Sequence, residues 1–160
     1  MLKKKKMNFN NYTTKSQETI QLAQQIAQGF GHHQIENEHI FKALTQIDTN
    51  VLPFLLKKLE INTIVLEQIL DKQIQSFPKV SGAELIFSRE ANKSLTEAPI
   101  IANKMKDDFV STEHLILAIF KSKSNISQVL KDQGVTEKRL QLAINELRKG
   151  ERVTSQNQEE

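Results

Sequence analysis

A glutamate followed directly by a histidine occurs twice in the chain, as Glu38-His39 and as Glu113-His114. Carboxylate and imidazole groups are the usual partners of general acid–base catalysis. Adjacent residues of a helix point about 100° apart, however, so the two groups of a pair do not naturally face one substrate. A glutamate near a helix start is also favoured by the helix dipole. Two interpretations stay open: a structural role, or contact of each glutamate with a cationic or N–H-rich group of a bound peptide.

Other arrangements that could carry chemistry are weak. His32-His33 with His39 matches no metal-binding spacing, and the chain has no cysteine to complete a zinc site. No glycine-rich phosphate loop and no defensible Ser/His/Asp set is present. We therefore expect no catalytic residue, no metal site and no cofactor in this chain, and we do not expect an enzyme.

The glutamate–histidine pairs belong to a longer internal repeat. The pairs are separated by 113 − 38 = 75 positions, and Ala23 corresponds to Ala98 at the same shift. After a one-residue gap the shift is 140 − 66 = 74, where Leu66 corresponds to Leu140. A duplicated unit of this length predicts two small helical bundles that pack as a pseudo-twofold pair. The seam between the halves would then offer a binding surface.

Apolar periodicity predicts helices throughout both copies. In the first unit we expect helices at residues 14–28, 37–48, 51–59 and 62–76, the first capped by Thr14 together with Gln17. In the second unit helices should begin near Ser88, Ser111, Ser124 and Thr136, which are preferred N-cap types. The run 115–120 is apolar on every side and predicts a central, buried helix.

The predicted fold is all-α, with two pseudo-twofold-related four-helix repeats in a single eight-helix globular domain. Its parts are repeat one (12–76), a joint (77–87) and repeat two (88–149), flanked by a basic extension (1–6) and a polar linker (151–160). Pro99 breaks the pattern, because a proline within a helix removes a hydrogen bond. We expect the helix there either to kink or to restart with Thr96 as its N-cap.

Composition excludes several classes. The chain has 160 residues and a net charge of +3, of which the run Lys3–Lys6 supplies four charges. A nucleic-acid-binding function would rest on that run alone, which we interpret as a disordered extension or an expression remnant, with Met1 or Met7 as the start. No apolar run approaches the ~20 residues of a membrane span, and no signal peptide is evident. We expect a cytoplasmic protein with neither a nucleic acid nor a membrane as partner.

Three segments resemble the Clp amino-terminal (Clp repeat) domain: 12–17 (Tyr-Thr-Thr-Lys-Ser-Gln), 38–40 (Glu-His-Ile) and 111–115 (Ser-Thr-Glu-His-Leu). The resemblance covers residues 7–150. The joint 77–82 and the exit 147–155 look most like the branch that serves hexameric AAA+ disaggregases. This implies a domain that catches exposed apolar segments of unfolded or aggregated client polypeptides. It further implies the ATPase ring of a parent protein as partner, with ATP and magnesium bound there, and a DnaK-type chaperone system that acts through the parent. The isolated domain should be monomeric and the parent a homohexamer.

The resemblance also implies site residues. Thr13, Asp107 and Glu113 match family positions tied to polypeptide engagement. An apolar seam is expected along the helix after the joint and its neighbour, with Leu95, Ile101 and Leu117, each of which also has a core interpretation. His114 and Glu97 are polar where relatives often carry apolar side chains, and His114 is an additional candidate contact.

A second hypothesis stays within the family. The repeated glutamates Glu38 and Glu113 resemble the pattern of unfoldases that feed a protease, in which they can receive adaptors or phosphoarginine-marked clients. The joint and the exit favour the disaggregase branch instead.

Overall fold

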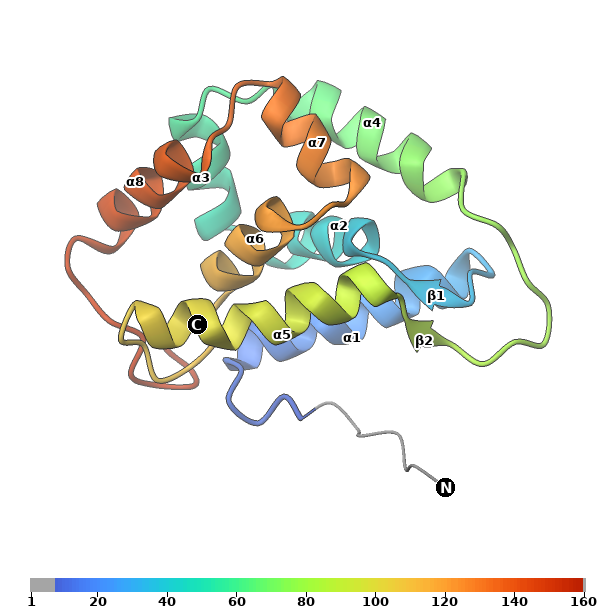
Figure 1. Ribbon diagram of the computed structural model, residues 1–160, viewed down its shortest axis with the longest axis horizontal. Helices are drawn as coiled ribbons and strands as arrows, with labels where there is room; N and C mark the ends of the chain where they lie inside the picture. Colours follow the sequence, from blue (N-terminus) through green and yellow to red (C-terminus); the bar gives the residue numbers. More distant parts are fainter. Residues whose placement is uncertain (1–7, 160) are drawn as a thin grey trace.

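The computed structural model describes residues 8–159, which form eight helices and two very short strands. Repeat one contains α1 (Thr14–Gly29), β1 (Gln34–Ile35), α2 (Asn37–Ile47), α3 (Val51–Lys58) and α4 (Thr63–Gln75), and repeat two contains β2 (Ile86–Phe87), α5 (Arg89–Lys104), α6 (Thr112–Lys121), α7 (Asn125–Asp132) and α8 (Glu137–Arg148) (Figure 1). The predicted all-α, eight-helix architecture is confirmed. The basic run at residues 3–6 lies outside the described residues.

Two short parallel pairings join the repeats. Ile35 of β1 lies opposite Phe87 of β2, and Tyr12 bridges to Val110. The residues of one pairing map onto those of the other at the repeat shift, since 87 − 12 = 75 and 110 − 35 = 75. Each repeat therefore gives its neighbour the pairing that it receives, as a pseudo-twofold axis requires. In the same way α3 packs against α8 and α4 against α7.

Helix starts coincide in the two repeats. The N-caps fall into four corresponding pairs: Thr13 with Ser88, Glu36 with Ser111, Asn50 with Ser124 and Asn62 with Thr136. The expected cap at Thr14 is wrong by one residue. Thr13 has an extended backbone and its hydroxyl accepts the Ser16 N–H, whereas Thr14 is already helical.

α5 continues through Pro99 and begins at its Ser88 cap, so the expected restart at Thr96 is wrong. A proline at position 99 leaves the Leu95 carbonyl without its helical N–H donor. The Tyr12 hydroxyl takes the place of that donor, at 2.7 Å from the Leu95 oxygen. A side chain from the other repeat thus donates to the carbonyl that Pro99 leaves without a helical hydrogen bond.

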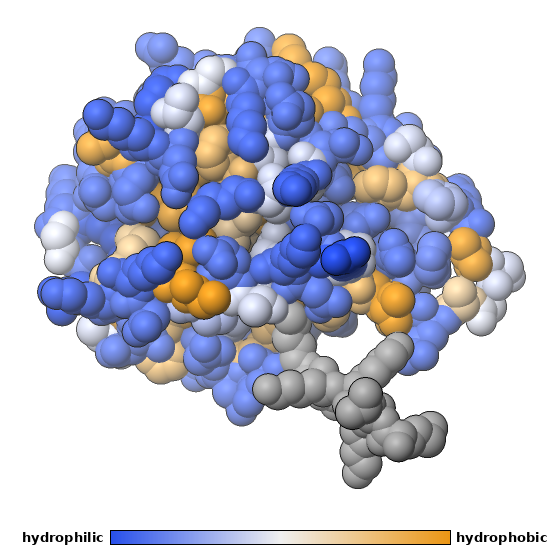
Figure 2. Space-filling model, in the orientation of Figure 1, coloured by the Kyte–Doolittle hydropathy of each residue, from blue (hydrophilic) through white to orange (hydrophobic). Residues whose placement is uncertain are grey.

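α6 is the central helix, as predicted, and every residue from Thr112 to Phe120 is buried. Within residues 8–159 no helix combines the length and apolar character needed to cross a bilayer. The face seen in Figure 2 is mostly hydrophilic, with small separate apolar patches.

Residues 151–159, which we call the covering segment, contain no helix, in keeping with their lack of periodicity. They nevertheless pack back onto the domain. The Val153 side chain is buried, and the Val153 carbonyl accepts the Asp108 N–H at 2.7 Å. The globular part therefore extends past Gly150, where the sequence suggested an end.

Candidate functional site

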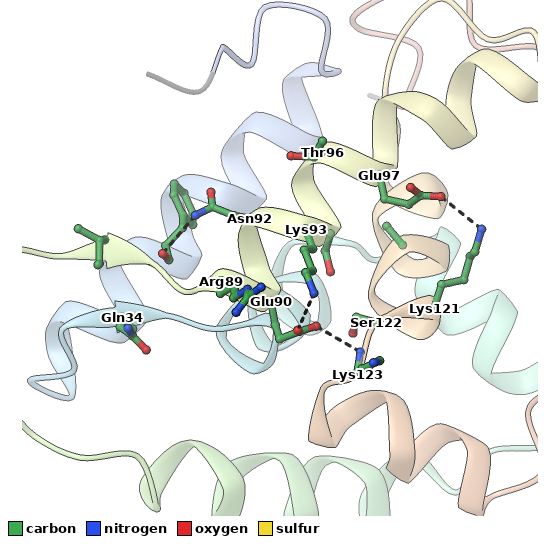
Figure 3. A pocket seen from close by; sticks show the side chains of 14 residues that line it. Gln34, Arg89, Glu90, Asn92, Lys93, Thr96, Glu97, Lys121, Ser122 and Lys123 are labelled. Atoms are coloured by element: carbon green, nitrogen blue, oxygen red, sulfur yellow. Dashed lines mark hydrogen bonds and ion pairs between the residues drawn. The ribbon is translucent and has the colours of Figure 1, made fainter. Parts of the chain in front are cut away.

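A groove of about 880 Å³ lies along the N-terminal half of α5 (Figure 3). It is bordered by β2 and by the connection between α6 and α7. Its lining residues are Gln34, Ile86, Phe87, Arg89, Glu90, Asn92, Lys93, Ser94, Thr96, Glu97, Ala118, Lys121, Ser122 and Lys123. This is the region where the sequence predicted an apolar seam, between the helix after the joint and its neighbour.

The groove combines an apolar floor with a charged rim. Ile86, Phe87 and Ala118 supply apolar surface, and Ile86 is 40% exposed. On the rim, Lys93 lies 3.5 Å from the Glu90 carboxylate and Lys121 lies 3.3 Å from that of Glu97. Four cationic side chains face two carboxylates, because Arg89 and Lys123 add to the two paired lysines. Such a rim favours polypeptide segments in which acidic residues flank apolar ones.

The predicted apolar contacts do not line this groove. Leu95, Ile101 and Leu117 are buried, at 2%, 5% and 3% exposure, and belong to the hydrophobic core. In this structure all three are therefore core residues, which was the alternative interpretation of each. The accessible apolar groups of the groove are the exposed Ile86 and the half-buried Phe87, both of which belong to the predicted joint and had no predicted role.

The predicted polar residues meet at a second place, which we call the junction. It lies where α1 and α6 begin and α8 ends. Arg148 connects it: its guanidinium donates to Asp107 at 2.6 Å and to Glu113 at 2.9 Å. His114 also contacts Asp107, with 2.7 Å between Nε2 and the carboxylate. Sequence reasoning missed Arg148, because nothing in the pattern of α8 marks its last arginine as a half-buried partner of two carboxylates.

Glu159 of the covering segment completes the junction. Its carboxylate accepts the Thr112 N–H at 3.0 Å and the Thr13 hydroxyl at 3.2 Å. Thr13, Asp107, Glu113 and His114 are therefore brought together, and all four are buried.

Both histidines of the repeated motif cap helices. The Nδ1 atoms of His39 and His114 accept the backbone N–H of the N-cap residues Glu36 and Ser111, each at 2.8 Å. This is the back-bond of a capping box, made by histidine at the position where glutamate or glutamine is usual.

The two glutamates have different partners. Glu38 accepts the Ile126 N–H at 3.0 Å and so caps α7 across the repeat interface. The corresponding start of α3 is capped by Asp48 instead, through the N–H groups of Val51 and Leu52. Glu113 therefore does not cap α3. Its carboxylate accepts hydrogen bonds from Arg148 and from the Ser111 hydroxyl instead.

Burial shifts the pKa values of three junction residues, and hydrogen bonds outweigh it at the fourth, Asp107. Burial lowers the pKa of His114 to about 4, against the opposing influence of Asp107. Burial alone would raise the pKa of Asp107, but hydrogen bonds from the Val153 N–H, Arg148 and His114 hold it below its ordinary value. Burial raises the pKa of Glu113, and burial together with the Glu113 charge raises that of Glu159 to about 7.

Among residues 8–159 no group of three or more His, Asp or Glu side chains is placed to hold a metal ion. His32 and His39 do contact each other, with 2.9 Å between their ring nitrogens. This contact belongs to the core beside Phe77.

Comparison with known proteins gives consistent relatives. The family described as the Clp repeat (R) N-terminal domain matches residues 11–159. The chaperone protein ClpB of Bacteroides thetaiotaomicron is 49% identical over 154 residues, which is 96% of this chain and 18% of that protein. ClpB of Porphyromonas gingivalis is 44% identical over the same shares. The chain thus spans less than a fifth of the length of these curated relatives.

Solved structures share the fold. The Hsp104 N-terminal domain of Candida albicans has a TM-score of 0.82 at 24% identity, covering 94% of this chain and 99% of that one. A complex of the ClpV N-domain with a VipB peptide has a TM-score of 0.73 at 13% identity, covering 92% of this chain and 95% of that one.

Proposed function

The chain belongs to the Clp repeat N-terminal domain family, and on that premise we propose that it is the client-binding N-terminal domain of a ClpB-type AAA+ chaperone. It would engage exposed apolar segments of unfolded or aggregated proteins, for ATP-driven disaggregation and refolding by a parent hexamer that cooperates with a DnaK-type system. The observation that carries the proposal is the 49% identity to ClpB along 96% of the chain. ATP and magnesium would bind in the ATPase modules of the parent.

The α5 groove suits this role. A client side chain seated on Ile86 and Phe87 removes apolar area from water, worth roughly 25 cal/mol per Å². One shallow groove would give weak and rapidly reversed binding. Six grooves on one ring raise the effective concentration and convert weak contacts into capture. A ClpV N-domain of the same fold has been solved with a VipB peptide, which supports peptide binding by this fold.

The protease-feeding alternative has less support. It requires Glu38 and Glu113 to receive a phosphoarginine or an adaptor group, but Glu38 caps α7 and Glu113 binds Arg148. Both side chains are buried, at 4% exposure each. We expect a phosphoarginine peptide to leave the NMR signals of both residues unshifted.

An NMR titration of the full chain with unfolded casein tests the proposal. We expect shifts that cluster on Ile86, Lys93 and Ala118. Ile86→Ser should weaken casein binding about fivefold, because ~1 kcal/mol of apolar contact is lost. Val80→Ser is the matched control, since Val80 has the same 40% exposure and lies outside the groove. Absence of shifts in the groove, or equal effects of the two substitutions, would contradict the assignment of clients to this groove.

A further inference from the structure

The covering segment is held against the junction as a ligand is held in a site. Its last described residue, Glu159, accepts the Thr112 N–H and the Thr13 hydroxyl, while its carbonyl accepts from the Lys15 ammonium at 3.1 Å. Thr112 is the first residue of α6, where backbone N–H groups have no partner within the helix. An acceptor side chain of the same polypeptide fills that position.

Backbone contacts hold the rest of the segment. The Gln156 carbonyl accepts the Thr14 N–H at 2.9 Å, and the Val153 carbonyl accepts the Asp108 N–H at 2.7 Å. The Val153 N–H in turn donates to the Asp107 carboxylate at 2.9 Å. These bonds use groups that every polypeptide has, so the surface beneath can recognise other sequences as well.

The docking is held by few apolar contacts. Val153 is the only buried apolar side chain of the covering segment, and the other described members are polar or charged. Glu159 also lies near the carboxylates of Glu113 and Asp48, which oppose its negative charge. A segment with one apolar anchor and like-charge neighbours belongs to the parts of a protein that open locally.

We propose that the covering segment occupies in cis a polypeptide-binding site on the junction, and that client segments carrying an aliphatic side chain and an acceptor side chain compete with it for that site. This inference rests on the proposed client-binding function and adds a second, regulated contact to the α5 groove. It would reconcile the predicted role of Thr13, Asp107 and Glu113 in polypeptide engagement with their burial here. Displacement of the segment uncovers the groups that it binds: the Thr112 N–H, the Thr13 hydroxyl and the Asp107 carboxylate.

Two variants of the full chain test the competition. Val153→Asp places a carboxylate beside Asp107 and should release the segment. Thr154→Asp adds the same charge one residue further on, at an exposed position, and is the control. We expect release to abolish hydrogen-exchange protection of the Asp108 amide. Casein should then bind about fivefold or more tightly, because apparent affinity scales with the open fraction of a site. New shifts should appear at Thr13 and Glu113.

A separate double-cysteine variant holds the covering segment in place with a disulfide. Thr14 and Asn157 have side-chain oxygens 2.7 Å apart, and the chain has no other cysteine, so Thr14→Cys with Asn157→Cys introduces one disulfide. Oxidation should remove casein-induced shifts at Thr13 and Glu113, and reduction of the same sample should restore them. This comparison holds even if Val153→Asp perturbs folding.

The outcomes separate the two proposals. Groove shifts at Ile86 and Lys93 with a junction that never responds, in released or reduced protein, would overturn the competition and leave the proposed function standing. An Asp108 amide that stays protected in Val153→Asp would likewise overturn it, because the segment would not be displaceable. Absence of casein shifts anywhere would overturn both.

Discussion

His39 and His114 are neutral rings held between two fixed partners. Because Nδ1 accepts a backbone N–H, the ring proton lies on Nε2, which faces His32 in repeat one and Asp107 in repeat two. Protonation of Nδ1 would set a hydrogen against the N–H that it accepts. This geometry favours the structural interpretation of the repeated motif, and it makes both rings sensitive to acid.

The capping role predicts an acid-dependent loss of stability. Burial lowers the pKa of His39 from 6.5 to about 4. Its contribution is therefore full above pH 6.5 and is lost as the pH falls toward 4, which amounts to roughly 2 kcal/mol between pH 7 and pH 5. His39→Gln keeps a side chain that can make the capping bond and removes the titration. Urea unfolding at both pH values should show a smaller pH-dependent loss in this variant than in the wild type.

His33→Gln is the control, because His33 lies in the bend directly before β1 and takes no part in the capping box of α2. Parallel pH dependences of His39→Gln and wild type would contradict the capping account.

The junction residues show what residue patterns can and cannot predict. Thr13, Glu113 and His114 lie at helix starts and Asp107 lies in the loop between α5 and α6, and their proximity follows from the two repeats packing together. Their partners Arg148 and Glu159 come from the end of α8 and from the polar covering segment. Neither residue belongs to a periodic pattern or a motif, so only the tertiary structure shows that they close the site.

At the scale of elements, α5 depends on a residue outside itself. Pro99 removes one helical hydrogen bond, and the Tyr12 hydroxyl satisfies the Leu95 carbonyl. Burial raises the pKa of Tyr12 far above its ordinary value, so the hydroxyl stays protonated as a donor. The two repeats are thus joined by a hydrogen bond as well as by strand pairing and apolar packing.

A double-mutant cycle can measure this dependence. Tyr12→Phe should cost about 1–2 kcal/mol of unfolding free energy, since it leaves the buried Leu95 carbonyl short of a donor. In a Pro99→Ala background the alanine N–H can donate to that carbonyl, and the cost should fall by about 1 kcal/mol. Additive effects of the two substitutions in urea unfolding would show that Tyr12 does not act through the Leu95 carbonyl.

Most elements could be predicted from local patterns, and the exceptions have physical causes. Helices were predictable because each of the eight starts beside a polar capping candidate or a conspicuous apolar period, as at Ser88 and Thr136. The continuity of α5 through Pro99 could not be predicted, because it depends on the Tyr12 hydroxyl, which lies 83 positions away in the sequence from the Leu95 carbonyl that it satisfies. β1, with only two residues, was also missed, since it exists through its pairing with β2.

The whole molecule is symmetric in backbone and asymmetric in chemistry. Glu38 caps α7, whereas Asp48 caps α3 and leaves Glu113 to Arg148. The covering segment docks beside Glu113. Glu38, the equivalent residue of repeat one, has no such segment beside it among residues 8–159. The two repeats provide equivalent helix starts at α2 and α6; the first holds the start of α7 through Glu38, and the second holds the covering segment through the Thr112 N–H.

Docking of the covering segment should therefore respond to pH in the direction opposite to the whole fold. Its Glu159 faces Thr112 and Glu113 of α6, Lys15 of α1, and Asp48 after α2. Burial and the Glu113 charge raise the pKa of Glu159 from 4.5 to about 7. A raised carboxyl pKa means that docking is strongest below pH 4.5 and weakens as the pH rises through 7.

Hydrogen exchange of the Asp108 amide reports this equilibrium, because that amide donates to Val153 of the docked segment. Its protection factor should fall on the order of tenfold from pH 5.5 to pH 7.5. Over the same range global stability should rise, since the buried histidines lose their destabilising protonation. Glu159→Gln cannot titrate, so its Asp108 protection factor should stay level. If wild type and Glu159→Gln change alike, the carboxyl of Glu159 does not control whether the junction is covered.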